Sequence, residues 1–235
     1  MLKAVFFDLD GTLLPMDQDV FVKGYFKYLA TMLAPHGYAP DKLIQAVWHG
    51  TEAMIRNDGS RTNEEAFWED FAKLMGPESL ADKPLFESFY RDEFPRAKQF
   101  CGFAPEAAEV VDFIREAGRR VILATNPIFP AVATEQRIRW AGLDPDRFER
   151  WTTYENCNYS KPNPEYYRML LDEAGLSAED CLMVGNDTGD DMVAETLGMR
   201  VFLLTPCLIN KKNEDISRWP HGGFAELTQY LKENL

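Results

Sequence analysis

Four short apolar runs recur along the chain, and most of the segments between them carry apolar residues at helical spacing. The runs are rich in β-branched and aromatic residues and do not alternate with polar ones; they cover residues 3–8, 119–126, 181–186 and 199–204. Strands that are apolar throughout are typical of a sheet covered on both faces. A weaker run near 148–154 is a candidate fifth strand. The pattern predicts a buried parallel sheet.

Three of the intervening segments are expected to be helices, over residues 105–118, 129–143 and 164–176. Each has a proline near its start and a glycine near its end, which are the residues preferred in the first helical turn and at the C-terminal cap. A last helix is expected at 224–234, after a surface connection over 205–223. Alternating strands and helices predict an α/β fold, a Rossmann-like parallel sheet with right-handed crossovers and helices on both faces.

The connection between the first two strands is too long for a single crossover helix. It contains at least three helical patterns and no convincing strand, and the patterns cover residues 19–33, 41–55 and 63–75. An inserted all-helical subdomain explains a connection of this kind. We therefore predict a core made of residues 1–15 and 99–235 and a helical insert over 16–98.

Composition narrows the possible partners and the location. The 235 residues carry a formal net charge of −13, which argues against broad binding of nucleic acid or anionic membranes because both require basic surfaces. No apolar run approaches the length of a membrane span, and charge interrupts the first apolar stretch too early for a secretory signal. The four cysteines have no metal-binding or redox-motif spacing. We expect a cytoplasmic protein.

Polar side chains follow the predicted strands at the point where each one ends. Because the carboxyl ends of parallel strands share one edge of a sheet, these side chains are expected to converge there. They are Asp8 and Asp10, then Thr125 and Asn126, then Lys161, and finally Asn186, Asp187, Asp190 and Asp191.

Such a set of side chains suits the chemistry of a phosphoryl group. Several carboxylates are tolerable at one edge if a hard divalent cation lies among them, and oxygen-only ligands favour Mg²⁺. With Lys161, the cation would neutralise the phosphoryl oxygens before an anionic nucleophile approaches. Asp8 is ionised at neutral pH, since an ordinary aspartate has a pKa of about 3.9, and is the expected nucleophile. Asp10 lies on the same side of the strand end and is the expected acid and base.

The four motifs, in this order, resemble the phosphatase branch of the haloacid dehalogenase-like hydrolase superfamily. DLDGT (8–12) is similar to its first motif, Thr125-Asn126 to its second, Lys161 to its third and GNDTGDDM (185–192) to its fourth. The resemblance implies that the insert is the family's helical cap and that the strand order is 5-4-1-2-3.

The resemblance also implies roles for individual residues. Asp8 is implied as the nucleophile and Asp10 as the acid and base, with Mg²⁺ bound by the Asp8 carboxylate and the Asp10 main-chain carbonyl. Thr125, Asn126 and Lys161 are implied as the groups that bind the phosphate.

The fourth motif departs from the family's pattern at Asn186, where an aspartate is frequent. We expect Asp187 to bind the metal, and whether Asn186 shares it stays open. Asp191 is expected to orient a metal-bound water or Lys161. Asp190 is expected to be a solvated charge on the first turn of a following helix.

The resulting hypothesis is a Mg²⁺-dependent phosphatase that acts on a small phosphorylated metabolite through an aspartyl-phosphate intermediate. A phosphosugar mutase with the same intermediate is the alternative, and no residue separates the two. A non-catalytic binding protein on this fold is the third hypothesis. The sequence indicates neither the substrate, nor the cap residues that select it, nor the oligomeric state.

Overall fold

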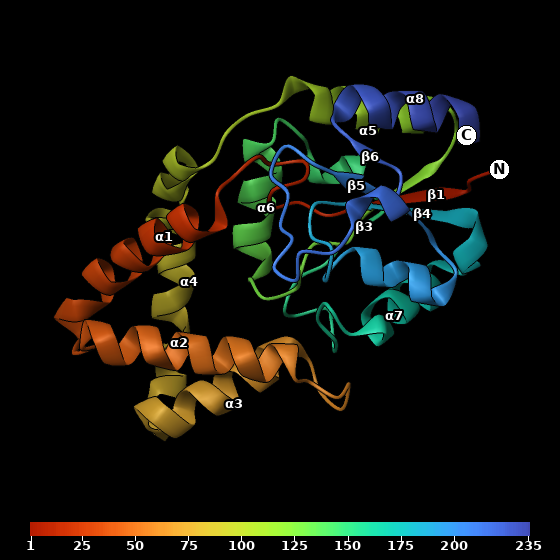
Figure 1. Cartoon of the computed structure of the whole chain (residues 1–235). Coiled ribbons are helices and arrows are strands. Elements are labelled where there is room, and N and C mark those ends of the chain that lie inside the picture. The colour runs from red at the N-terminus through yellow and green to blue at the C-terminus, as the bar shows by residue number, and fades with distance from the viewer.

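The computed structural model describes residues 1–235 and centres on a parallel sheet (Figure 1). Its six strands are hydrogen-bonded in the order β3-β2-β1-β4-β5-β6. The strands are β1 (Ala4–Phe7), β2 (Arg120–Leu123), β3 (Arg150–Trp151), β4 (Cys181–Gly185), β5 (Arg200–Leu204) and β6 (His221–Gly222). All five expected strands are present, and the strand order implied by the resemblance is confirmed for them.

The sheet is covered on both faces, because alternate residues of each strand point to opposite sides. Val5 and Phe7 face the side that carries α5 (Pro105–Glu116), α6 (Ala131–Trp140) and α8 (Phe224–Asn234). Ala4 and Phe6 face α7 (Pro164–Ala174) and the 3₁₀ helix η6 (Met192–Leu197). Figure 1 shows α5 and α8 on one side of the strands and α7 on the other. The predicted α/β class is confirmed.

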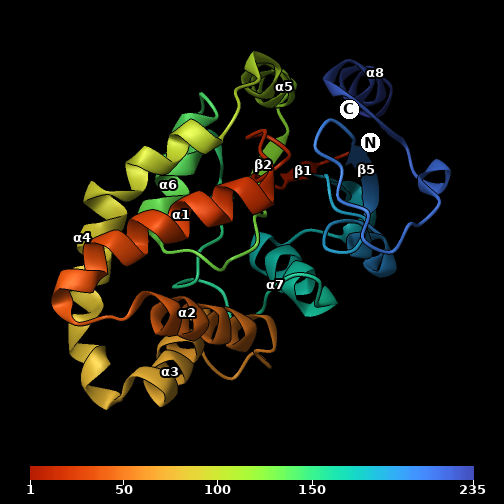
Figure 2. The ribbon, with the colours of Figure 1, turned by 60° about the vertical axis from the view of Figure 1, so that its left-hand side comes forward.

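Between β1 and α5 the chain forms a helical insert that lies beside the sheet in both views (Figure 1, Figure 2). Its helices are α1 (Gln18–Leu33), α2 (Pro40–Ile55), α3 (Asn63–Met75) and α4 (Lys83–Asp92). The first three match the expected patterns. The helical patterns in the sequence do not separate α4, which follows a short 3₁₀ stretch that begins at Pro77. The domain limits at 15/16 and 98/99 stay a prediction.

The insert is attached to the core at its base and at the start of α3, among other contacts. At its base, Met16 pairs with Cys101 in an antiparallel bridge, and the Gly102 N–H donates to the Pro15 carbonyl (2.6 Å). The second attachment is at the start of α3, where the Asn63 N–H donates to the Cys157 carbonyl (2.8 Å).

The Asn63 side chain strengthens this second attachment. It is fully buried, and its Nδ2 donates to the Pro127 carbonyl, the Tyr159 carbonyl and Ser160 Oγ over 3.0–3.2 Å. The Glu64 N–H adds a hydrogen bond to the core by donating to the Tyr154 carbonyl at 2.8 Å. The start of α3 is therefore bonded to the loop that leads to Lys161.

The segment expected as a surface connection contains one further strand. β6 joins the edge of the sheet when the Leu203 N–H donates to the Pro220 carbonyl and the Thr205 N–H donates to the Gly222 carbonyl, each at 2.9 Å. Two residues are too short to show an apolar period, which is why the pattern did not indicate them. None of the helices in the structure is long and apolar enough to span a membrane.

Candidate active site

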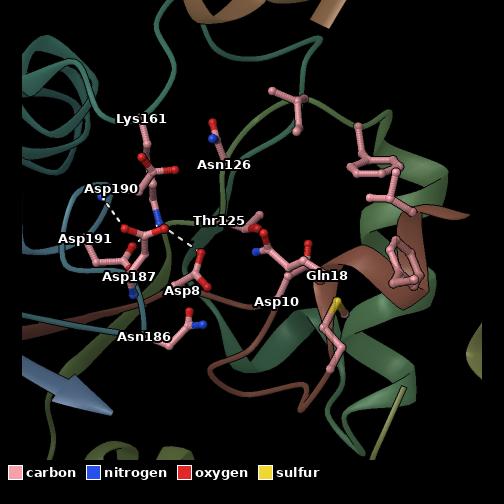
Figure 3. A pocket seen from close by; sticks show the side chains of 15 residues that line it. Asp8, Asp10, Gln18, Thr125, Asn126, Lys161, Asn186, Asp187, Asp190 and Asp191 are labelled. Atoms are coloured by element: carbon pink, nitrogen blue, oxygen red, sulfur yellow. Dashed lines mark hydrogen bonds and ion pairs between the residues drawn. The ribbon is translucent and has the colours of Figure 1, made fainter. Parts of the chain in front are cut away.

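A cavity of about 140 Å³ opens at the carboxyl edge of the sheet, and all the expected polar side chains line it. The parallel register aligns Phe7 with Leu123 and with Val184, so β1, β2 and β4 end level with one another. Figure 3 shows the side chains that follow these ends gathered around Asp8. From the expected set, the cavity is lined by Asp8, Asp10, Thr125, Asn126, Lys161, Asn186, Asp187, Asp190 and Asp191.

Lys161 joins two carboxylates at the centre of this group. Its Nζ donates to Asp8 Oδ1 at 2.8 Å and to Asp191 Oδ1 at 2.6 Å, and the lysine is 1% exposed. Burial disfavours the charged ammonium, but the Asp191 and Asp8 carboxylates together raise the pKa of Lys161 well above its ordinary value. Lys161 is therefore a buried cation at neutral pH.

Asp191 holds the surrounding loop as well as the lysine. Its second oxygen, Oδ2, accepts from the Asp187 N–H at 2.9 Å. Burial raises the pKa of the Asp191 carboxyl, and the Lys161 charge opposes the shift. Gly185 leaves room for this carboxylate, since a Cβ there would lie 2.2 Å from Asp191 Cγ. Asp191 thus lies in contact with Lys161, and its role in orienting the lysine stays a prediction.

The opposite oxygen of Asp8 is held less tightly. Oδ2 accepts from the Thr12 hydroxyl at 3.2 Å, and that hydroxyl is also 3.0 Å from Asn186 Oδ1. The Asn186 Nδ2 donates to the Cys207 carbonyl at 2.7 Å. Asn186 thus connects the first and fourth motifs at the wall of the cavity.

Thr125 and Asn126 present unused polar groups to the cavity. The Thr125 carbonyl accepts from the hydroxyls of Thr152 and Tyr166, whereas the Thr125 hydroxyl has no protein partner. Asn126 Oδ1 is buried and also lacks a partner. Polar groups of this kind are suited to a ligand, because a buried group without a hydrogen bond is unfavourable.

Asp187 and Asp190 lie in a turn ahead of η6. Asp187 Oδ1 accepts from the Gly189 and Asp190 N–H groups at 2.7 and 3.1 Å, and nothing in the protein donates to its Oδ2. The expectation of Asp190 as a solvated helical charge is wrong, because its side chain is partly buried and lines the cavity. Burial raises the pKa of Asp190, and the neighbouring Asp187 charge adds to the shift.

Asp10 has a partner that the sequence analysis missed. Arg137, on α6, is fully buried, and its Nη1 donates to Asp10 Oδ2 in an ion pair. The guanidinium also donates to Thr134 Oγ1 at 3.1 Å and lies 4.3 Å from the centre of the Phe129 ring. Asp10 Oδ1 is left buried without a partner. Burial raises the pKa of Asp10, and the Arg137 charge opposes the shift.

The site's donors fit Mg²⁺ in kind. Asp187 Oδ2 and the Asp10 main-chain carbonyl accept no hydrogen bond, and Asp8 adds a carboxylate beside them. All three supply oxygen, the ligand that Mg²⁺ prefers. No three His, Cys, Asp or Glu side chains are grouped closely enough to hold a metal by themselves. A main-chain carbonyl and water would have to complete the set, which is usual for Mg²⁺.

The other half of the cavity was not anticipated. It is lined by side chains from α1, from the segment before it and from the segment after β2, namely Met16, Gln18, Phe21, Val22, Ile128 and Phe129. No motif marks these residues, because their inward direction depends on how α1 packs against the core.

Comparisons with known proteins identify the family. The model of the haloacid dehalogenase-like hydrolase family matches residues 2–198. A phosphoglycolate phosphatase of Pseudomonas aeruginosa is 26% identical over 86% of this chain and 69% of its own. An N-acetylmuramic acid 6-phosphate phosphatase of the same species is 25% identical over 87% and 84%.

Solved structures show the same fold. A 2-haloacid dehalogenase of Pseudomonas syringae superposes with a TM-score of 0.66 at 22% identity over 99% of both chains. A phosphatase of Thermococcus onnurineus gives a TM-score of 0.62 at 20% identity over 98% of both chains.

Proposed function

The chain belongs to the haloacid dehalogenase-like hydrolases, and we propose that it is a Mg²⁺-dependent phosphatase of small phosphomonoesters that forms an aspartyl-phosphate. The observation that carries the proposal is the contact between Lys161 Nζ and Asp8 Oδ1 (2.8 Å) inside a cavity. This contact supports a site at which a phosphoryl group meets both a nucleophilic carboxylate and a buried cation. The relatives named as phosphatases support the same reaction class.

In the first step, an Asp8 oxygen attacks phosphorus while the bond to the leaving oxygen breaks. Asp10 gives its proton to that oxygen. Lys161, the Thr125 hydroxyl and the Asn126 amide bind the phosphoryl oxygens and stabilise the charge that develops on them. Mg²⁺, when bound by Asp8, Asp187 and the Asp10 carbonyl, supplies further charge neutralisation.

In the second step, water attacks phosphorus and the aspartyl-phosphate bond breaks. Asp10, now a carboxylate, takes the proton from water, so that Asp8 and Asp10 both return to their starting states. The unpartnered Asp10 Oδ1 is the oxygen that this proton transfer requires, since Oδ2 is paired with Arg137.

The helical insert is proposed to act as a cap over this site, with residues 16–98 as its extent. A covered site favours a small metabolite over a phosphoprotein, and we propose that the enzyme works in the cytoplasm. Relatives named as phosphatases of phosphoglycolate and of N-acetylmuramic acid 6-phosphate support a small phosphomonoester as the substrate class.

The test is phosphate release from p-nitrophenyl phosphate with Mg²⁺ present. Asp8→Asn is expected to reduce the rate at least about a thousandfold, because the amide cannot attack phosphorus. Asp172→Asn, on the exposed surface of α7, is the matched control and should leave the rate unchanged. Chelation of the metal should abolish the wild-type rate, and added Mg²⁺ should restore it.

Equal rates for wild type and Asp8→Asn would contradict the proposal and favour a binding protein. Product analysis with a hexose phosphate separates the other alternative. A phosphatase releases inorganic phosphate, whereas a mutase returns an isomeric sugar phosphate.

A further inference from the structure

The half of the cavity that faces away from Asp8 carries information about the leaving group, and the inference drawn from it rests on the proposed phosphatase activity. Five of its six side chains are apolar, and the sixth is the amide of Gln18; the apolar ones are Met16, Phe21, Val22, Ile128 and Phe129. In Figure 3, Gln18 lies beside Asp10 and across the cavity from Lys161 and Asp191. The part of a substrate that extends from the phosphate would meet these groups.

The charged side chains of the cavity are not arranged for a second anion. Five aspartates line it, and Lys161 is the single cation among the lining residues. Lys161 is already held between Asp8 and Asp191. The neighbouring cation, Arg137, is fully buried outside the lining and paired with Asp10.

The surface next to Gln18 does not supply a compensating excess of positive charge. The adjoining hollow is lined by Asp17, Asp19 and Lys211, whose formal charges sum to −1. A carboxylate attached to the leaving group would therefore lie among apolar carbons or beside other carboxylates. Such burial is unfavourable unless a cation or several hydrogen-bond donors meet the charge.

We propose that the substrate is a phosphomonoester with a short, uncharged leaving group, and that a leaving group bearing a carboxylate is rejected. The apolar side chains would contact its carbon atoms, and the Gln18 amide can donate to or accept from one hydroxyl or carbonyl. The cavity of 140 Å³ is small beside the roughly 300–1,000 Å³ of pockets that enclose larger ligands. Gln18 and Val22 are the residues that set this selectivity.

The selectivity is measured with a matched pair of substrates. n-Propyl phosphate and 2-phosphoglycolate have similar length and differ in the carboxylate. We expect the wild type to show a kcat/KM at least about tenfold higher for n-propyl phosphate, since a tenfold ratio needs only about 1.4 kcal/mol of differential binding. A ratio near one, or a preference for 2-phosphoglycolate, would overturn the proposal.

Two variants test whether α1 is the source of the selectivity. Gln18 and Val22 are four residues apart and share one face of the helix, so Gln18→Arg and Val22→Arg each place a cation in the apolar half. Each is expected to shift the ratio at least about tenfold toward 2-phosphoglycolate. Gln18 is exposed, so its variant should fold even if Val22→Arg does not. Val20→Arg is the control, because Val20 is 48% exposed and does not line the cavity.

The outcomes distinguish this proposal from the broader one. If p-nitrophenyl phosphate is hydrolysed but n-propyl phosphate is not, or if folded Gln18→Arg leaves the ratio unchanged, the leaving-group proposal is wrong and the phosphatase stands. If Asp8→Asn retains the rates of the wild type, the phosphatase proposal fails first.

Discussion

Removal of the guanidinium of Arg137 should expose how strongly the buried pair with Asp10 contributes to the fold. Arg137→Met keeps an unbranched apolar stem and deletes the guanidinium with its charge. The Asp10 carboxylate then loses its ion pair, and Thr134 loses the donor to its hydroxyl. Asp10→Asn makes the complementary change, and the double variant removes both charges.

The expected magnitude follows from burial. The Arg137 side chain is fully buried and that of Asp10 is 20% exposed. Removal of one partner from a buried pair costs about 3–5 kcal/mol, because the other charge is left uncompensated. The residual exposure of Asp10 favours the lower end, so we expect Arg137→Met to lose about 3 kcal/mol. The double variant should lose about 2 kcal/mol less than the sum of the two single variants.

Urea unfolding followed by circular dichroism measures these free energies. The pH dependence gives a second measurement, because without Arg137 only the Lys161 charge opposes the effect of burial on the Asp10 pKa. A carboxyl whose pKa is higher in the folded state than its ordinary 3.8 binds more protons when the protein is folded. Its ionisation therefore destabilises the folded state increasingly as the pH rises from 3.8 through the folded-state pKa. The loss in Arg137→Met should therefore be larger at pH 7 than near pH 4.

The pH dependence of kcat gives an independent measure of the Asp10 pKa. A higher Asp10 pKa in Arg137→Met should move both limbs of the kcat profile to higher pH, since Asp10 must carry a proton for the leaving group and must then be ionised to activate water. Arg137→Lys, which keeps a charge, should move it less. The stabilising role of the pair is refuted if Arg137→Met loses less than about 1 kcal/mol of unfolding free energy, if the effects of the two single variants are additive in the double variant, and if the kcat profile does not shift.

Three further variants probe the site. Lys161→Met should lose about 3–5 kcal/mol in urea unfolding and at least about a hundredfold in phosphate release, because two carboxylates stay buried without their cation; an unchanged stability would contradict the burial argument. Gly185→Ala should reduce kcat at least about tenfold by displacing Asp191 from Lys161, since a Cβ would lie 2.2 Å from Asp191 Cγ. Asn63→Ala, measured by thermal unfolding, should cost about 1–3 kcal/mol because buried acceptors lose their donor; a neutral result would show that they are satisfied otherwise.

The expected polar side chains could be placed from the sequence because of one geometric fact. Parallel strands bring their carboxyl ends to a common edge, so residues as distant as Asp8 and Lys161 were expected together, and they lie in contact. The apolar runs identified the strands, and the polar side chains after them marked the edge.

Arg137 could not be found by the same reasoning. It lies in the stretch TEQRIRW, which is mostly polar and charged, so that an arginine is expected at the surface. Its burial arises only when α6 packs so that the guanidinium lies over Phe129 and meets Asp10. Asp190 was misplaced for a related reason, because the chain makes a turn before η6 where a helix was expected.

The bonds at the start of α3 have a mechanical consequence for catalysis. Asn63 is fastened to Tyr159 and Ser160, and the residue that follows them is the lysine whose charge the phosphate needs. A movement of α3 away from the core would either break these hydrogen bonds or move the backbone of Tyr159 and Ser160 with it. If the insert acts as the proposed cap, its opening would therefore also displace the Lys161 ammonium from Asp8, so substrate entry and positioning of the positive charge would be coupled.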